Sequence, residues 1–366
     1  MQRMRIVKQK AGDSREDVFQ NLPVLSALRV MVVPAVTSQL IVLIYNMADT
    51  FYVGQTNNPY MVASTSLILP VFNITLCLAG LAGIGGGALI SRLLGQDDPD
   101  EARRVGAFSL YLGALIAAVF AIGMGKGSII TFSPRAGLPR RENVIAVFAV
   151  GVPSAIAAFL FDMDYVIIDK LMVSYGDLAL AAVGIVLKVE RFPLNVGIGI
   201  CQGMLPLVAY NCAAQNKQRM EDTIRLARTL GLIIAGASVV LYELFAVQFT
   251  RLFISDPQTL EMAAQFLRIR VLATPLMFLS FFTVYLFQSF GKGRFSLFLG
   301  VTRWLVFNIP MLFLLNAVFG MYGIVWSQAA ADILTVALSF FVYHKYRPRF
   351  TKTPGGYPPG VFVQIP

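Results

Sequence analysis

The chain has 366 residues, of which 57% are hydrophobic and only 14% are charged, and its mean hydropathy is +0.68. A soluble domain of this composition would expose large apolar patches, so the composition excludes an ordinary soluble protein and indicates a membrane protein. The formal net charge of +10 raises the alternative of a nucleic-acid-binding protein.

The distribution of the basic residues argues against that alternative, and no nucleic-acid partner is expected. Lys and Arg collect in short polar stretches between apolar segments, as they do in the cytoplasmic loops of membrane proteins. These stretches are Arg3 to Arg15, Arg92 to Arg104, Lys126 to Arg141, Lys217 to Arg228, Lys292 to Arg303 and Lys345 to Lys352.

Nine segments are apolar and long enough to be candidate transmembrane helices, since a spanning helix needs about 20 apolar residues at about 1.5 Å each. They predict an all-α, polytopic membrane protein of about nine hydrophobic helices. Residues 1–24 are polar and basic and no cleavage site follows them, so a signal peptide is not expected. The segments are approximately 30–53, 63–91, 106–123, 144–172, 182–212, 227–250, 262–290, 295–316 and 320–343.

The order of features in the first part of the chain returns after a shift of 119 residues. In both copies a proline opens an apolar segment, glycines interrupt the following apolar run, and a polar turn with charges closes it. Internal repeats of this kind are typical of transporters, whose substrate site lies between the two copies. The positions in register are Pro34 and Pro153, Gly80 and Gly199, and Gln96 and Gln215.

A basic linker divides the chain into two pseudo-repeat lobes. We expect an N-terminal transmembrane lobe over 1–125, the cytoplasmic linker over 126–142, a C-terminal six-helix lobe over 143–345 and a polar tail over 346–366. Only three of the predicted helices precede the linker.

Carboxylates inside apolar segments are the first candidate site residues. A charge at the membrane centre costs roughly 2.5–3.5 kcal/mol on insertion scales, so such groups are functional by default. Asp49, in the outer part of its segment, is either a cation- or proton-binding group or a solvated helix-end carboxylate. Asp162 and Asp164 lie near mid-depth of a long helix. Two residues apart, they lie on well-separated faces, so only one is expected to face a given cavity.

Four further polar residues complete the candidate cation- and substrate-binding set. Glu190 either joins the site or pairs with its neighbour Lys188 or Arg191. Asn195 and Gln202 are seven residues apart and therefore share one helix face. Asp332 lies within an apolar helix and is expected to face protein rather than lipid. The whole set is Asp49, Asp162, Asp164, Glu190, Asn195, Gln202 and Asp332.

Other motifs carry no chemistry in this context. The run from Gly83 to Ala88 formally matches the dinucleotide fingerprint G-x-G-x-x-A, but that motif requires a preceding strand. We interpret its glycines as a close helix contact, with a hinge as the alternative. Three cysteines without CxxC spacing predict neither a disulfide nor a metal site. No hydrolase or metalloprotease motif is present, so an enzyme is not expected.

Several short motifs, taken together, resemble the multidrug and toxic compound extrusion (MATE) family. The resemblance implies two six-helix lobes, antiport driven by Na⁺ or H⁺, and export of amphipathic, often cationic drugs. The motifs are Met47 to Gly54, Gly95-Gln96 with its charged turn, Pro206 to Asn211, Gln288 to Gly293, and Arg303 with Asn308-Ile309-Pro310.

The resemblance also carries residues. The first-helix carboxylate of the family corresponds to Asp49, and the carboxylate that some members have in the seventh helix corresponds approximately to Asp162. Arg294 stands where some members have an acidic residue, which leaves that branch's cation scheme open. The family's first lobe has six helices, so the resemblance implies that helices four to six are missing here.

The expected function is that of a monomeric, multi-pass antiporter of the bacterial inner membrane. It would export small organic cations in exchange for Na⁺ or H⁺, with no cofactor other than the coupling ion. One alternative is an inactive, truncated remnant of a transporter. Another is a lipid or oligosaccharide flippase of the same superfamily, which is less favoured because the basic residues lie at the ends of the segments.

Charge and parity predict one further feature. Basic stretches near both ends of the chain favour two cytoplasmic termini and an even number of spans, which nine spans cannot give. If 106–123, the shortest segment, does not cross, eight spans remain and every basic stretch lies in the cytoplasm.

Overall fold

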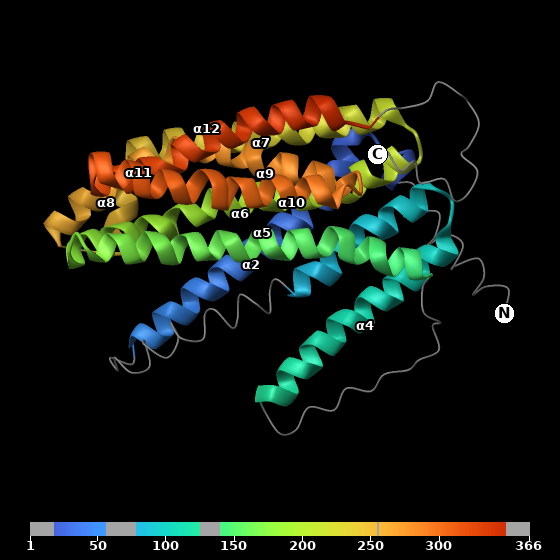
Figure 1. Ribbon diagram of the computed structural model, residues 1–366, viewed down its shortest axis with the longest axis horizontal. Helices are drawn as coiled ribbons and strands as arrows, with labels where there is room; N and C mark the ends of the chain where they lie inside the picture. Colours follow the sequence, from blue (N-terminus) through green and yellow to red (C-terminus); the bar gives the residue numbers. More distant parts are fainter. Residues whose placement is uncertain (1–17, 56–77, 125–139, 255, 349–366) are drawn as a thin grey trace.

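A computed structural model describes residues 18–55, 78–124, 140–254 and 256–348, and these residues are all-helical (Figure 1). At some helical positions, including Asp49 and Asp162, only the backbone is described. The helices are α2 (Val24–Gln55), a helix over Leu78–Gly95, α4 (Pro99–Met124), α5 (Arg141–Val173), α6 (Asp177–Ala213), α7 (Lys217–Arg251), α8 (Pro257–Val271), α9 (Thr274–Ser289), α10 (Gly293–Val301), the π-helical segment η1 (Thr302–Asn308), α11 (Ile309–Phe319) and α12 (Met321–Tyr346).

Within the described residues, six helices are long and apolar enough to cross a membrane, counting α10, η1 and α11 as one. Together, α8 and α9 are also long and apolar enough to form a seventh span. This span would be broken, because the two helices meet at an angle of 47°. The prediction of an all-helical, polytopic membrane fold is confirmed. The predicted segments 262–290 and 295–316 are both irregular, the first broken and the second π-helical at its centre.

Helix α6 is the central element, and two apolar clusters lie along it. In one, Ile200, Met204 and Val208 pack with residues of α2, α7 and α9. In the other, residues of α6 before Glu190 pack with α5, α8 and the beginning of α12. A helix that is apolar on most of its surface is buried among other helices, and α6 has this character.

Small residues set the closest helix contacts. A Cβ atom on Gly203 of α6 would lie 2.5 Å from the Cα of Val32 in α2, so the two backbones touch there. A Cβ on Gly85 would lie 2.4 Å from the carbonyl oxygen of Val147 in α5. The predicted close contact of the glycine run is thus confirmed at Gly85, whereas Gly83 has nothing within 4 Å.

The internal repeat is visible in two matching turns, and the structure corrects its register. Asp97 and Gln215 both adopt a left-handed backbone, with φ of 57° and 58°. Each turn closes with the same hydrogen bond, from Asp98 N to Leu93 O at 3.0 Å and from Asn216 N to Asn211 O at 2.9 Å. The structural offset of the turns is therefore one residue less than the predicted 119.

Glu101 ties the beginning of α4 to the beginning of α5. Its Oε1 accepts hydrogen bonds from the backbone N–H of Arg140 at 2.8 Å and from Asn143 Nδ2 at 2.7 Å. Burial acts to raise the pKa of Glu101, but these hydrogen bonds, with Arg104 and Arg140, hold that pKa below its ordinary value. From this shared end α4 runs away from the bundle (Figure 1).

Candidate functional site

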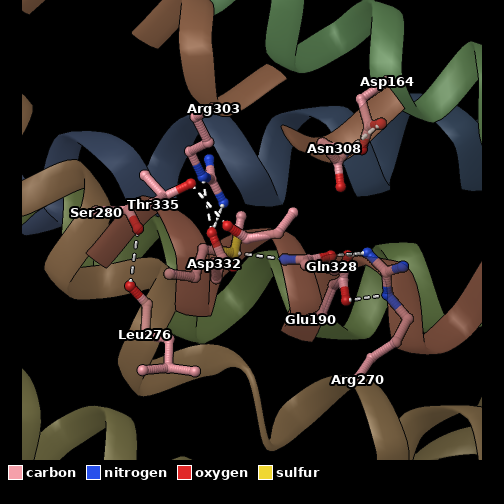
Figure 2. A network of polar contacts seen from close by, with 12 residues as sticks. Asp164, Glu190, Arg270, Leu276, Ser280, Arg303, Asn308, Gln328, Asp332 and Thr335 are labelled. Carbon is pink, nitrogen blue, oxygen red and sulfur yellow. Dashed lines mark hydrogen bonds and ion pairs between the residues drawn. The ribbon is translucent and has the colours of Figure 1, made fainter. Parts of the chain in front are cut away.

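Buried charged side chains on α5, α6, α8, η1 and α12 form one network (Figure 2). Its first part is a two-bond ion pair between α8 and α6. Arg270 Nε lies 2.7 Å from Glu190 Oε2, and Arg270 Nη2 lies 2.8 Å from Glu190 Oε1. Arg270 also donates to Gln328 of α12, and the Tyr165 hydroxyl donates to Glu190 at 3.4 Å. Both charges of this pair therefore have partners.

The second part of the network is an ion pair between η1 and α12. Nε and Nη2 of Arg303 each lie 2.8 Å from Asp332 Oδ1, and both side chains are almost fully buried. The Arg303 guanidinium also lies over the rings of Trp304 and Phe281, at 4.2 and 4.7 Å from their centroids. Aromatic faces stabilise a cation that has left water, so Arg303 is held as a charged group.

Asp164 is the third carboxylate of the network, and its partner is neutral. Its side chain is buried and accepts a hydrogen bond from Nδ2 of Asn308, at the end of η1 (Figure 2). Within the described residues Asp164 forms no ion pair. If every buried group of the network is ionised, the three carboxylates exceed the two buried arginines by one negative charge; the half-buried Arg191, over the Tyr165 ring, lies outside this count. A proton or a small cation at Asp164 would balance this negative charge, which a buried site strongly favours.

Aromatic rings lie beside Asp164. Phe161 makes edge-to-face contacts with Tyr165, Phe281 and Trp304, at centroid distances of 5.0, 6.0 and 5.4 Å. Arg191 lies over the Tyr165 ring at 4.7 Å. Such faces attract organic cations as well as guanidinium groups, so the cluster could contact a cationic substrate next to Asp164.

The structure brings together three of the seven predicted site residues: Asp164, Glu190 and Asp332. The expectation that Glu190 pairs with Lys188 or Arg191 is wrong, because its partner is Arg270, on another helix. The expectation that Asp332 faces protein is confirmed by its ion pair and its burial.

The other four predicted residues do not join this network in the described structure. Asn195 donates to the Arg191 carbonyl oxygen of its own helix at 2.7 Å. Gln202 instead accepts from Gln39 of α2 at 2.9 Å and donates to Tyr285 of α9 at 3.4 Å, so it joins three helices elsewhere. The side chains of Asp49 and Asp162 lie outside the described residues.

The sequence interpretation places neither arginine of the network in the site, although Arg303 belongs to one of the motifs that carry the family resemblance. The basic stretch Lys292 to Arg303 predicts a loop position for Arg303, but this residue lies within a helix and has 3% of its surface exposed. Arg270 was not singled out at all. Arg303 is the single cation of the predicted segment 295–316, and Arg270 shares the segment 262–290 only with Arg268 near its beginning; a cation inside a membrane span indicates a buried partner.

No group of three or more His, Cys, Asp or Glu side chains that could hold a metal ion exists in the described part of the chain. Within those residues, a Na⁺ ion at Asp164 would therefore need neutral oxygen ligands besides the carboxylate, as hard cations accept.

Comparison with known proteins identifies a family. A family model described as MatE matches residues 34–124 and 153–314. The multidrug export protein MepA of Staphylococcus haemolyticus is 23% identical over 436 aligned positions, which cover 91% of this chain and 96% of MepA.

Solved structures share the fold. A MATE protein crystallised in complex with MaL6 superposes with a TM-score of 0.76 at 16% identity, over 90% of this chain and 97% of the other. A transporter of the MOP superfamily from Pyrococcus furiosus gives a TM-score of 0.72 at 16% identity, over 89% and 97%. For the latter, a reverse polarity of the binding pocket is said to suggest a different function.

Proposed function

We propose that this chain, which belongs to the MatE family of multidrug efflux transporters, exports organic cations in exchange for Na⁺ or protons. It is a multi-pass membrane protein and not an enzyme. The exchanged ion, the charge of the substrate and the residues that bind them belong to the proposal.

The observation that carries the proposal is the unbalanced charge at Asp164. Arg270 and Arg303 are each paired with a carboxylate of their own, whereas Asp164 has only the amide of Asn308. A coupling ion and a cationic drug can each neutralise Asp164, but not at the same time. This mutual exclusion is the requirement for antiport, because loading of one ligand releases the other.

Export of an anionic lipid or oligosaccharide is the second candidate, and the buried arginines favour it. The sequence interpretation disfavoured this function because the basic residues were assigned to segment ends, which Arg270 and Arg303 contradict. The Pyrococcus furiosus relative is described as having a pocket of reverse polarity. The charge count favours the cation, because both arginines are already neutralised by Glu190 and Asp332.

A transport assay tests the proposal. Protein reconstituted in vesicles is expected to expel a fluorescent organic cation when an inward Na⁺ or proton gradient is imposed. Asp164→Asn should abolish the flux while the protein still folds, and Asp49→Asn and Asp162→Asn test the other two predicted carboxylates. No flux by the unchanged chain would favour the inactive remnant. Full flux by Asp164→Asn would show that the ion binds elsewhere.

The shortened first lobe is also part of the proposal. The family match over 34–124 is little more than half as long as the match over 153–314. The alignment with MepA has 436 positions although this chain has 366 residues, so MepA contains segments without a counterpart here. The shorter family match supports loss of helices from the first lobe, as the resemblance implies, and the alignment with MepA is consistent with it without locating the missing segments.

In this shortened lobe α4 does not cross the membrane. Helix α4 begins beside the beginning of α5, where Glu101 accepts a hydrogen bond from the backbone N–H of Arg140. From there its 26 residues extend about 39 Å away from the bundle (Figure 1). If α4 crossed, residues 125–139, which include Lys126 and Arg135, would have to cross back. That segment is too polar for a spanning helix, and an irregular chain in lipid leaves its backbone groups without partners.

Single cysteines at Ser133 and Thr351, both outside the described residues, test this topology in a chain without its native cysteines. An impermeant thiol reagent is expected to label both positions from the cytoplasmic side. Labelling of both from the opposite side would show that α4 crosses and that the second lobe inserts against its charges.

A further inference from the structure

The π-helical segment η1 places two polar residues of one helix in the same interior. Arg303 and Asn308 are five residues apart, and both are 3% exposed. In an α-helix, residues five apart point roughly 140° away from each other, since each residue turns the chain by about 100°. In a π-helix the hydrogen bonds join residues five apart, so these residues lie on neighbouring turns of one side.

The two side chains midway between Arg303 and Asn308 lie on the opposite, exposed side of the helix, as this arrangement requires. Leu305 and Val306, in the middle of η1, have 46% and 55% of their surface exposed. Arg303 reaches Asp332 of α12, and Asn308 reaches Asp164 of α5. Arg303 and Asn308 can therefore reach Asp332 and Asp164 from the same helix, because the π turn of η1 contains one residue more than an α-helical turn.

We propose that Asn308 is a positioning residue for Asp164, brought to it by the π turn, and that its amide competes with the transported ion for the Asp164 carboxylate. The inference rests on the proposed function of Asp164. The Asn308 Nδ2 group donates to Asp164 Oδ1, one of the two oxygens on which an ion would bind. Arrival of the ion displaces this donor, and release of the ion restores it.

Trp304 offers a reporter within η1 that does not depend on transport. The chain has only two tryptophans. Trp304 is buried beside Arg303, whereas Trp326 is 44% exposed on α12. In a Trp326→Phe background, the fluorescence of Trp304 should change when Na⁺ is added at constant pH, or when protons are added without Na⁺. The charged groups around Asp164 are Glu190, Arg270, Arg303 and Asp332, and this background leaves them unchanged.

The variant Asn308→Ala removes the competing donor. Because a hydrogen bond to a charged group is strong, the fluorescence change should then occur at about tenfold lower ion concentration. Asn316→Ala is the matched control, since this amide of α11 binds Tyr175 at 2.6 Å instead. A purely structural role for Asn308 would alter folding and leave the ion concentration at half-response unchanged.

Deletion of Val306 tests the role of the π turn and remains informative if Asn308→Ala does not fold. The deletion makes Asn308 the fourth residue after Arg303, and residues four apart share a face of an α-helix. The ion response should therefore stay as in the unchanged chain. A tenfold shift in this deletion variant, or an unshifted response in folded Asn308→Ala, overturns the inference. An unchanged response in Asp164→Asn would instead overturn the proposed function.

Discussion

The ion pair between Arg303 and Asp332 gives a prediction whose size can be worked out from the structure. The variant Asp332→Asn leaves the Arg303 guanidinium buried without a counter-charge. The two side chains are 4% and 1% exposed, and two donor–acceptor distances are 2.8 Å. Breaking a buried pair on one side costs about 3–5 kcal/mol, and at about 2.1 cal/mol/K of unfolding entropy per residue over 366 residues the melting temperature in detergent should fall by about 5 °C.

A second ion pair of the same chain is the matched control. Glu243 and Arg268 approach only to 4.0 Å, with 38% and 48% of their side chains exposed. Exposed pairs of this kind contribute about 0–1 kcal/mol, so Glu243→Gln should barely change the melting temperature.

The double variant Arg303→Met with Asp332→Leu separates loss of the pair from exposure of an unpaired charge. Replacement of a buried ion pair by apolar side chains is often neutral or stabilising. The double variant should thus melt well above Asp332→Asn. The reasoning is refuted if Asp332→Asn and Glu243→Gln shift the melting temperature equally, or if the double variant is no more stable than Asp332→Asn.

Two further predictions concern the helix contacts. Gly203→Ala should destabilise the protein by about 1–3 kcal/mol, because its Cβ would meet the α2 backbone. Gly184 lies in the same helix, and a Cβ there would have nothing within 4 Å, so Gly184→Ala should be neutral or stabilising. Equal melting temperatures of the two variants would contradict the contact at Gly203. The pKa of Glu101 lies below its ordinary value of 4.5 in the folded protein, so its contribution is present above pH 4.5 and is lost as the pH falls through the lowered pKa. Glu101→Gln should remove that part of the acid destabilisation, and parallel curves of melting temperature against pH for the two proteins would count against it.

The positions of the helices follow from properties that each segment carries by itself. Apolar length indicated the spans, and a carboxylate within such a span indicated Asp164, Glu190 and Asp332, because its cost in lipid is local. The glycine contact at Gly85 could be predicted for the same reason, since a missing side chain on a membrane helix allows close approach.

The pairing within the site depends on tertiary structure, which local sequence does not contain. Glu190 and Arg270 are 80 residues apart, and Asp164 and Asn308 are 144 apart. The sequence offers Glu190 either a place in the site or a pair with its neighbour Lys188 or Arg191, and nothing near it in the sequence points to Arg270. Hydropathy also does not distinguish an α-helix from a π turn, so the alignment of Arg303 with Asn308 could not be predicted.

In the proposed mechanism one buried carboxylate, Asp164, binds the ion and the drug alternately. The affinity of purified protein for a fluorescent organic cation, measured at increasing Na⁺ concentration and at decreasing pH, tests it most directly, since it does not require transport. We predict that at least one of the two ions weakens drug binding and that Asp164→Asn abolishes this effect. Drug affinity that is independent of both ions, or the same competition in Asp164→Asn, would contradict the claim.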